Sequence, residues 1–180
     1  RNEEAKEILT KAIKINPQHV LAYNNLGNIF RKLCQPEKAQ EAFETVLKLD
    51  PKFAAAYCNL GHLFYSNNQY EIAIQNYNKA LNLSDKLENL TGALLFSQAK
   101  LCDWTHREIN IKKMMLQIKK GEQASVPFNL FPLIDEPEIK KQAAIVYSKN
   151  FKRNFIFNRT KIFDKNKKIK IGYFSPDFKA

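Results

Sequence analysis

Two stretches of the chain repeat each other at a spacing of 34 residues. Residues 23–51 read YNNLGNIFRKLCQPEKAQEAFETVLKLDP, and residues 57–85 read YCNLGHLFYSNNQYEIAIQNYNKALNLSD. The matched positions are Tyr23 and Tyr57, Leu26 and Leu60, Gly27 and Gly61, Phe30 and Phe64, Ala39 and Ala73, and Phe43 and Tyr77. A fixed period of this length is typical of arrays in which each repeat is one supersecondary unit.

The residue types at these positions resemble the tetratricopeptide pattern, in which each repeat is a pair of antiparallel helices. The glycines and alanines allow the paired helices to approach closely. Continuing the register backwards pairs Ala5 with Ala39 and Pro17 with Pro51, so we expect the chain to open inside the second helix of an earlier repeat. The predicted helices lie at about residues 18–33, 36–48, 52–66 and 70–82. Asn16 and Asp50, each followed by a proline, are predicted helix caps.

The next unit departs from the pattern. Asp85 replaces the proline, and Glu88 follows at the spacing of a capping box, which predicts that a helix begins there. Leu94-Leu95 replaces Leu-Gly, and Gln98 replaces the aromatic residue. We therefore expect the array to end with this helix as its cap, so that residues 1–101 form one repeat domain.

The inner surface of such an array is a groove suited to extended peptides. Asn25 and Asn59 precede the two Leu-Gly pairs and are predicted to face this groove. A carboxamide can donate to and accept from a peptide backbone at once, so both residues are predicted to bind peptide. An alternative is that the two matched Asn residues reflect composition and have no binding role. Asn makes up 18 of the 180 residues, so two Asn can fall at matched positions by drift.

The overall composition excludes several classes of protein. A hydrophobic content of 44% supports a buried core, which excludes collagen-like and fully disordered chains. Five Gly and seven Pro are too few for a turn-rich all-β protein. Three widely spaced cysteines (Cys34, Cys58 and Cys102) fit neither a metal site nor a disulfide framework, so we expect reduced thiols. With no leader or membrane span in the sequence, the expected location is cytoplasmic, with no membrane partner.

The net charge of +11 is concentrated in the second half of the chain. Residues 1–85 carry ten Lys or Arg against nine acids, whereas residues 86–180 carry nineteen against nine. Residues 149–170 alone hold nine cations and one acid, interleaved with phenylalanines. Such a run is typical of a single-strand nucleic-acid binder and equally of a solvated connector. No RNA-binding motif accompanies it, so a connector is favoured and no nucleic-acid partner is expected.

The residues after the array predict further helices and one strand. Asp103 or Thr105 is expected to cap a helix whose apolar face ends before Gly121, with Trp104 as a packing anchor. Residues 126–134 are apolar and rich in proline, which predicts buried extended chain. Asp135 and Glu138 predict another helix start, with Ile139, Ala143, Val146 and Tyr147 on its apolar face. Residues 168–175 read KIKIGYFS and predict a first β-strand of an α/β domain.

Three motifs in this order resemble the O-GlcNAc transferase family of glycosyltransferases. They are LCDWT at 101–105, PFNLFPL at 127–133 and IGYFSPDF at 171–178, all following the repeats. The resemblance implies an all-α tetratricopeptide superhelix (1–101), a helical linker (102–167) and the start of a truncated Rossmann-like catalytic domain (168–180). It also implies a parent enzyme that transfers a sugar from a UDP-sugar, such as UDP-GlcNAc, to acceptor proteins held by the repeats.

No catalytic, cofactor or metal residue is expected within these 180 residues, and the fragment alone is expected to be inactive. The active-site histidine of the family would follow Asp177-Phe178 beyond Ala180. The histidines present, His19, His62 and His106, are interpreted as solvated or packing residues. A different class remains open: a tetratricopeptide interaction adaptor with no chemistry and a basic tail.

Overall fold

The computed structural model describes residues 2–84 and 86–149, which form eight α-helices and one 3-10 helix. The first five helices are α1 (Asn2–Ile15), α2 (Val20–Lys32), α3 (Pro36–Leu49), α4 (Ala54–Ser66) and α5 (Tyr70–Leu83). They are followed by α6 (Leu90–Lys100), α7 (Arg107–Lys119), η1 (Pro127–Leu130) and α8 (Pro137–Ser148). All regular secondary structure in the described residues is thus helical. The strand predicted at 168–174 lies outside them, as do all residues of the basic run 149–170 except Lys149.

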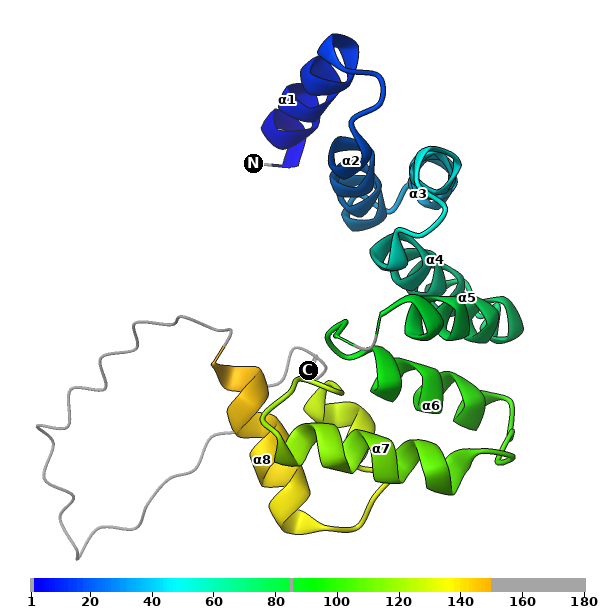
Figure 1. Cartoon of the computed structure of the whole chain (residues 1–180), viewed down its shortest axis with the longest axis vertical. Coiled ribbons are helices and arrows are strands. Elements are labelled where there is room, and N and C mark those ends of the chain that lie inside the picture. Colours follow the sequence, from blue (N-terminus) through cyan, green and yellow to red (C-terminus); the bar gives the residue numbers. More distant parts are fainter. Residues whose placement is uncertain (1, 85, 150–180) are drawn as a thin grey trace, which may run out of the picture.

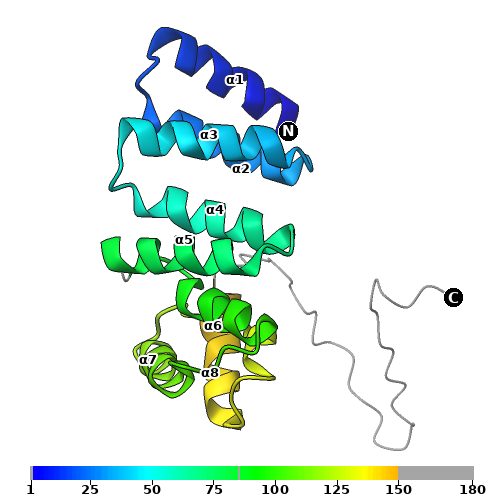
Figure 2. The same cartoon turned by 90° about the vertical axis from the view of Figure 1, so that its right-hand side faces the viewer.

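The helices form two regions along the long axis of the molecule (Figure 1). Helices α1 to α5 are stacked one after another, and α6, α7 and α8 gather at the far end of the stack (Figure 2). Helix α2 packs on α3, and α4 packs on α5, as the 34-residue pattern predicts. The predicted helix boundaries are correct to within two residues at each end.

Each repeat is held together by an aromatic ring that lies against a glycine. Phe43 is fully buried, and a Cβ added to Gly27 would lie 2.6 Å from its ring. Tyr77, also fully buried, lies against Gly61 in the same way. Any larger residue at either glycine would force the two helices of the pair apart.

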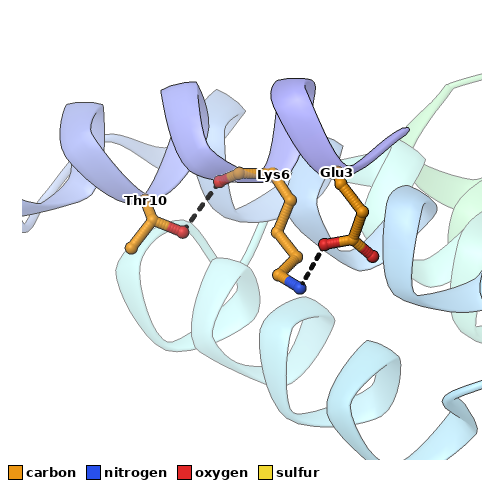
Figure 3. A network of polar contacts seen from close by, with 3 residues as sticks. All are labelled: Glu3, Lys6 and Thr10. Carbon is orange, nitrogen blue, oxygen red and sulfur yellow. Dashed lines mark hydrogen bonds and ion pairs between the residues drawn. The ribbon is translucent and has the colours of Figure 1, made fainter. Parts of the chain in front are cut away.

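The first helix, α1, occupies the position of a second repeat helix and packs on α2. It has no buried residue, because nothing covers its outer side among the described residues. Its exposed surface is stabilised locally: Lys6 Nζ lies 2.6 Å from Glu3 Oε2, and Thr10 Oγ1 donates to the Lys6 carbonyl at 2.8 Å (Figure 3). Such exposed pairs contribute little to stability.

The proline-containing turns differ from the prediction that Asn16 and Asp50 cap the following helices. Asn16 Oδ1 accepts from the Gln18 amide, and Asp50 Oδ1 accepts from the Lys52 amide, each at 3.0 Å. A side chain bonded to the amide two residues ahead forms an Asx turn. The turn takes up the residues before the helix, so α2 and α4 begin later, after His19 and Phe53.

Helices α2, α4 and α6 end in the same left-handed turn, at Cys34, Asn68 and Cys102. These residues are 34 positions apart and have φ values of 55°, 59° and 54°. In each case the following amide bonds back to a carbonyl five residues earlier, as in a Schellman motif. Helix α6 is therefore the first helix of a third unit and keeps the register of the repeats.

The third unit differs after α6 because its small residues are missing. Leu95 occupies the position of Gly27 and Gly61 and is buried, and Arg107 occupies the position of the alanines. A helix cannot approach α6 closely at these positions. Instead, α7, η1 and α8 build a second core around Leu95, whose further buried members include Met114, Ile118, Leu130, Leu133 and Ile139. Leu90 and Leu94 belong to the core of the second repeat, so α6 connects the two cores.

A strap formed by residues 123–125 fastens this second core to the start of α6. The Asn89 and Gly92 amides donate to the carbonyls of Gln123 and Ala124, at 2.6 Å and 2.9 Å. Gly92 lies directly against Ser125, so no side chain fits there. Helix α6 begins at Leu90, after Asn89, and not near Asp85 as the capping-box spacing predicted.

Several predictions for the segment after α6 need correction. Asp103 is not a helix cap: its Oδ1 accepts from the amide and hydroxyl of Thr105, and α7 begins only after His106. Trp104 is no packing anchor, since its side chain is 52% exposed and stacks on the Arg107 guanidinium. Residues 127–130 form a 3-10 helix and not extended chain, which buries Leu130 and leaves Phe128 exposed.

Other expectations for this segment are confirmed. Met114 and Ile118 of α7 are fully buried, and Ile111 and Met115 pack against the same core. Gly121, with a φ of 80°, follows the end of α7. Ile139, Ala143 and Val146 of α8 are buried on one face, although Glu136 precedes the helix without a side-chain cap.

Candidate peptide-binding face

The first helices of successive units line one side of the stack. Helix α2 contacts α4, and α4 contacts α6, whereas no contact joins the second helices α3 and α5 in the described part of the chain. Helices that touch lie on the tighter side of a curved stack, so α2, α4 and α6 line its inner side. We use the term inner face for the surface formed by residues at three matched positions of these helices. The first position holds Asn25, Asn59 and Ala93, the second holds Asn28, His62 and Phe96, and the third holds Arg31 and Tyr65.

Asn25 lies on the inner face, with its side chain exposed. It lines an open pocket of about 630 Å³ between α1 and α2, together with Asn28 and Arg31. Among the hydrogen bonds that join described side chains, none engages the Asn25 carboxamide. Its donors and acceptor are available to a bound chain.

Asn59 has a different environment from Asn25. It is half-buried, and its Nδ2 donates a 2.9 Å hydrogen bond to Oδ1 of Asn24 in the preceding repeat. Asn24 itself is only 8% exposed. One end of the Asn59 carboxamide therefore joins two repeats, and only the remainder can serve a ligand.

The sequence interpretation missed Asn24 because no matching residue exists in the next repeat, where Cys58 occupies its position. The bond connects residues 35 apart, one more than the period. A comparison of matched positions alone does not detect it.

His62 belongs to the inner face and is part of a polar cluster with the buried residues Cys58 and Tyr77. Its Nδ1 lies 2.9 Å from the Tyr77 hydroxyl, and its Nε2 lies 3.5 Å from the Cys58 sulfur. Burial, assisted by the Arg31 charge, lowers the pKa of His62 to about 4. Burial raises the pKa of the Cys58 thiol to about 11, although Arg31 opposes this shift. At neutral pH both groups are uncharged, so His62 is a packing residue, which is one of its two predicted roles.

His19 and His106 stand at helix starts. His19 Nδ1 accepts from the Ala22 amide at 3.3 Å and caps α2, whereas His106 precedes α7 without a side-chain cap bond. Within residues 2–84 and 86–149, no group of three His, Cys, Asp or Glu residues is arranged to hold a metal ion.

Farther along the inner face, a smaller pocket of about 180 Å³ opens between α4, α5, α6 and the segment after the strap. Rings of His62, Tyr65 and Phe96 line it, together with Ala93 and Val126. Asn89 and Asn129 also reach it. This pocket combines apolar walls with a few polar atoms, which is the usual character of a ligand site.

The inner helices contain no acidic residue. Helices α2, α4 and α6 together hold Arg31, Lys32 and Lys100 but neither Asp nor Glu. The outer helix α3, in contrast, carries Glu37, Glu41 and Glu44. The inner helices thus carry only positive formal charge, which favours a partner with carboxylates.

The comparisons with known proteins agree with this architecture. A family model described as tetratricopeptide repeat matches residues 20–53 and 54–86, and a second model with the same description matches residues 1–19. Residues 1–86 are tetratricopeptide repeats. No curated protein matches the chain significantly in sequence.

Solved structures with similar folds include other proteins built from tetratricopeptide repeats. A crystal structure of MamA is 18% identical, covers 82% of this chain and 85% of its own, and has a TM-score of 0.56. MamA from Desulfovibrio magneticus RS-1 (residues 41 to the end) is 24% identical, with 66% and 67% coverage and a TM-score of 0.58. YrrB, described as a TPR protein with an unusual peptide-binding site, is 20% identical, with 83% and 87% coverage and a TM-score of 0.53.

These similarities show the fold, a tetratricopeptide superhelix. They do not link the chain to the O-GlcNAc transferase family. No helix in the described ranges is long and apolar enough to cross a lipid bilayer.

Proposed function

We propose that this chain is a protein-interaction scaffold whose repeats bind an extended polypeptide along the inner face. The observation that carries the proposal is the open pocket at Asn25, Asn28 and Arg31, which presents unengaged amide groups beside a cation. Amides that donate and accept can pair with a peptide backbone whatever its sequence. Of the two functions predicted from the sequence, this is the interaction adaptor.

The charge of the inner face narrows the partner to a segment with acidic side chains. Arg31 is exposed at the edge of the Asn25 pocket, and Lys32 adjoins it. In the part of the chain that the structure describes, no carboxylate lines this pocket or the smaller one. An acidic segment would therefore meet attraction along the face and no compensating repulsion.

A peptide library tests the proposal. Random dodecapeptides displayed on phage are selected against the purified chain, and the selected peptides are synthesised and titrated by calorimetry. We expect acidic peptides whose affinity falls about 2- to 10-fold in Asn25→Ala and in Arg31→Ala, as expected for the loss of one hydrogen bond or exposed ion pair. We also expect their affinity to fall with added salt.

Two matched variants on the second repeat helices serve as controls. Asn78→Ala removes a carboxamide from an exposed position on α5, and Lys48→Ala removes a positive charge from an exposed position on α3. They should leave peptide affinity unchanged. Selected peptides that respond to the control variants, and not to Asn25→Ala or Arg31→Ala, would refute the inner face as the binding surface.

In a second candidate function, this scaffold delivers acceptor proteins to a UDP-sugar-dependent glycosyltransferase. This candidate rests on the three sequence motifs alone. Two of the motifs lie within described residues: 101–105 link α6 to α7, and 127–133 pack through Leu130 and Leu133 into the second core. The third motif, at 171–178, lies outside the described residues.

The second candidate needs the parent protein for its test. Radiolabelled UDP-GlcNAc incubated with the full-length protein and a selected peptide should label Ser or Thr of that peptide. The 180-residue chain alone should bind UDP-GlcNAc no more tightly than about 1 mM in calorimetry, which corresponds to about 4 kcal/mol. Absence of any transfer by the full-length protein would leave the adaptor as the function.

A further inference from the structure

We infer that the smaller pocket of the inner face binds one tyrosine side chain of the polypeptide held there. This inference rests on the proposed function and specifies its partner. The pocket lies between α4, α5 and α6, and Val126 also lines it. Ala93 occupies the repeat position of Asn25 and Asn59, so a chain that follows these residues along the inner face passes over the pocket.

The size and walls of the pocket suit a single aromatic ring. Its volume of about 180 Å³ is well below that of sites for nucleotides or cofactors, which reach several hundred Å³. The Tyr65 and Phe96 rings, with centroids 6.1 Å apart and planes inclined at 40°, form one wall. The neutral His62 ring adds another aromatic surface. Aromatic rings pack favourably edge-to-face or offset, so such walls prefer a ring to an aliphatic chain.

One polar atom distinguishes tyrosine from phenylalanine. Asn89 Oδ1 is buried at this pocket and has no hydrogen-bond partner among the described residues. The residue is held in place, because its own amide donates to Gln123 and its carbonyl accepts from Ala93. A buried acceptor without a partner is costly, and a ligand that supplies a donor removes this cost.

The His62 ring does not compete for that role. The two ring nitrogens of His62 are already bonded to Tyr77 and Cys58. A tyrosine hydroxyl donates a proton to Asn89 Oδ1, whereas the side chains of phenylalanine and leucine have no donor. Lys100 lies over the Phe96 ring at 5.6 Å, so a carboxylate next to the tyrosine in an acidic segment would find a cation close by.

The test uses small probes in place of the unidentified partner. N-acetyl amides of tyrosine, phenylalanine, tryptophan and leucine are titrated into the ¹⁵N-labelled chain, and binding is followed by NMR shifts of the Asn89 and Asn129 side-chain amides. We expect tyrosinamide to bind about 2- to 10-fold more tightly than phenylalaninamide, which is the range for one hydrogen bond. Leucinamide and the larger tryptophanamide should bind more weakly than tyrosinamide.

Matched variants identify the acceptor. Asn89 has a φ of 60°, which glycine adopts freely, so Asn89→Gly removes Oδ1 without backbone strain and should abolish the preference for tyrosine over phenylalanine. Asn68→Gly makes the same change at a φ of 59° on an exposed turn outside the pocket and should preserve the preference. Ala93→Leu should block all four probes, whereas Ala144→Leu, on an exposed part of α8, should block none.

Three results would overturn the inference. They are equal affinity for tyrosinamide and phenylalaninamide, tighter binding of leucinamide or tryptophanamide, and a tyrosine preference that survives Asn89→Gly. The probes report on this pocket alone, so a negative result with them is independent of the result of the peptide library. If acidic peptides without tyrosine bind the inner face and the probes give no response, the proposed scaffold function stands and the tyrosine pocket is refuted.

Discussion

Asn59 Nδ2 donates to Asn24 Oδ1 at 2.9 Å and joins the first helices of two successive repeats. The partner atom belongs to a side chain that is only 8% exposed. The sequence prediction gave Asn25 and Asn59 one shared role, but the structure gives them different environments. The two residues should therefore respond differently to the same substitution.

Asn59→Ala should destabilise the array. The substitution leaves the buried Asn24 carboxamide without its partner, which costs about 1 to 3 kcal/mol. Urea unfolding monitored by circular dichroism measures the change. Asn24→Ala with Asn59→Ala should cost less than the sum of the single variants, because both remove the same bond. Additive losses would show that the bond contributes nothing.

Asn25→Ala should leave stability unchanged or slightly improved, since the side chain is exposed and Ala is the better helix former. Its effect should be confined to peptide binding. The combined variant Asn25→Ala with Asn59→Ala should therefore lose stability through Asn59. A loss of stability in Asn25→Ala alone would contradict its exposed position.

Gly61→Ala should destabilise the second repeat by about 1 to 3 kcal/mol. The added methyl group would collide with the Tyr77 ring. Helix propensity favours Ala over Gly by about 1 kcal/mol, so a net loss identifies the collision. In a Tyr77→Leu background the same change should cost less, because the ring is absent. Thermal unfolding of the four proteins gives the comparison, and an equal cost in both backgrounds would exclude the contact.

Stability should fall as the pH is lowered from about 6.5 towards 4. Burial lowers the pKa of His62 from 6.5 to about 4, so in this range the unfolded chain binds a proton that the folded chain does not. The contribution of neutral His62 to the free energy of unfolding is fully present above pH 6.5. Below the folded-state pKa, the loss of this contribution amounts to about 3 kcal/mol.

Urea unfolding between pH 4.5 and 7.5 tests this dependence, with His62→Asn as the comparison. Asn28 occupies the matching position in the first repeat, so Asn is compatible with the helix pair. All other ionisable groups are common to both proteins. Only the difference between the two curves of unfolding free energy against pH therefore reports on His62. Identical pH dependence would show that His62 is protonated equally in the folded and unfolded states.

The three cysteines should differ in reactivity. Cys34 and Cys102 are exposed, whereas Cys58 is buried and its thiol has a pKa raised to about 11. Alkylation requires the thiolate. At pH 7.5 iodoacetamide should modify Cys58 at least about tenfold more slowly than the other two, as followed by peptide mass spectrometry. In guanidinium chloride the three rates should converge, and a fast Cys58 in the folded chain would refute its burial.

The array of helices could be predicted because it depends on periodic residue types. Apolar residues at helical spacing and a glycine facing an aromatic ring 16 residues later recur with the period, as Gly27 with Phe43 and Gly61 with Tyr77 do. Both residues of each pair are needed for the close packing of one repeat. The pairing is therefore visible in the sequence without knowledge of the tertiary structure.

The helix starts were predicted less well, because a short polar side chain can bond in more than one way. Asn16, Asp50 and Asp103 all precede helices, and each bonds to the amide two residues ahead in place of a helix amide. Local sequence allows both arrangements. The path of the chain between packed helices selects the turn.

The sequence alone determined the repeat register and the helix pairs. Each depends on residues within one period. Only the tertiary structure decided the Asn24–Asn59 bond, the second core around Leu95 and the pocket at Asn89, because these join residues from different units or from non-repeating segments. Contacts of this kind depend on how far one helix stands from the next, and that distance is set by packing of the whole stack.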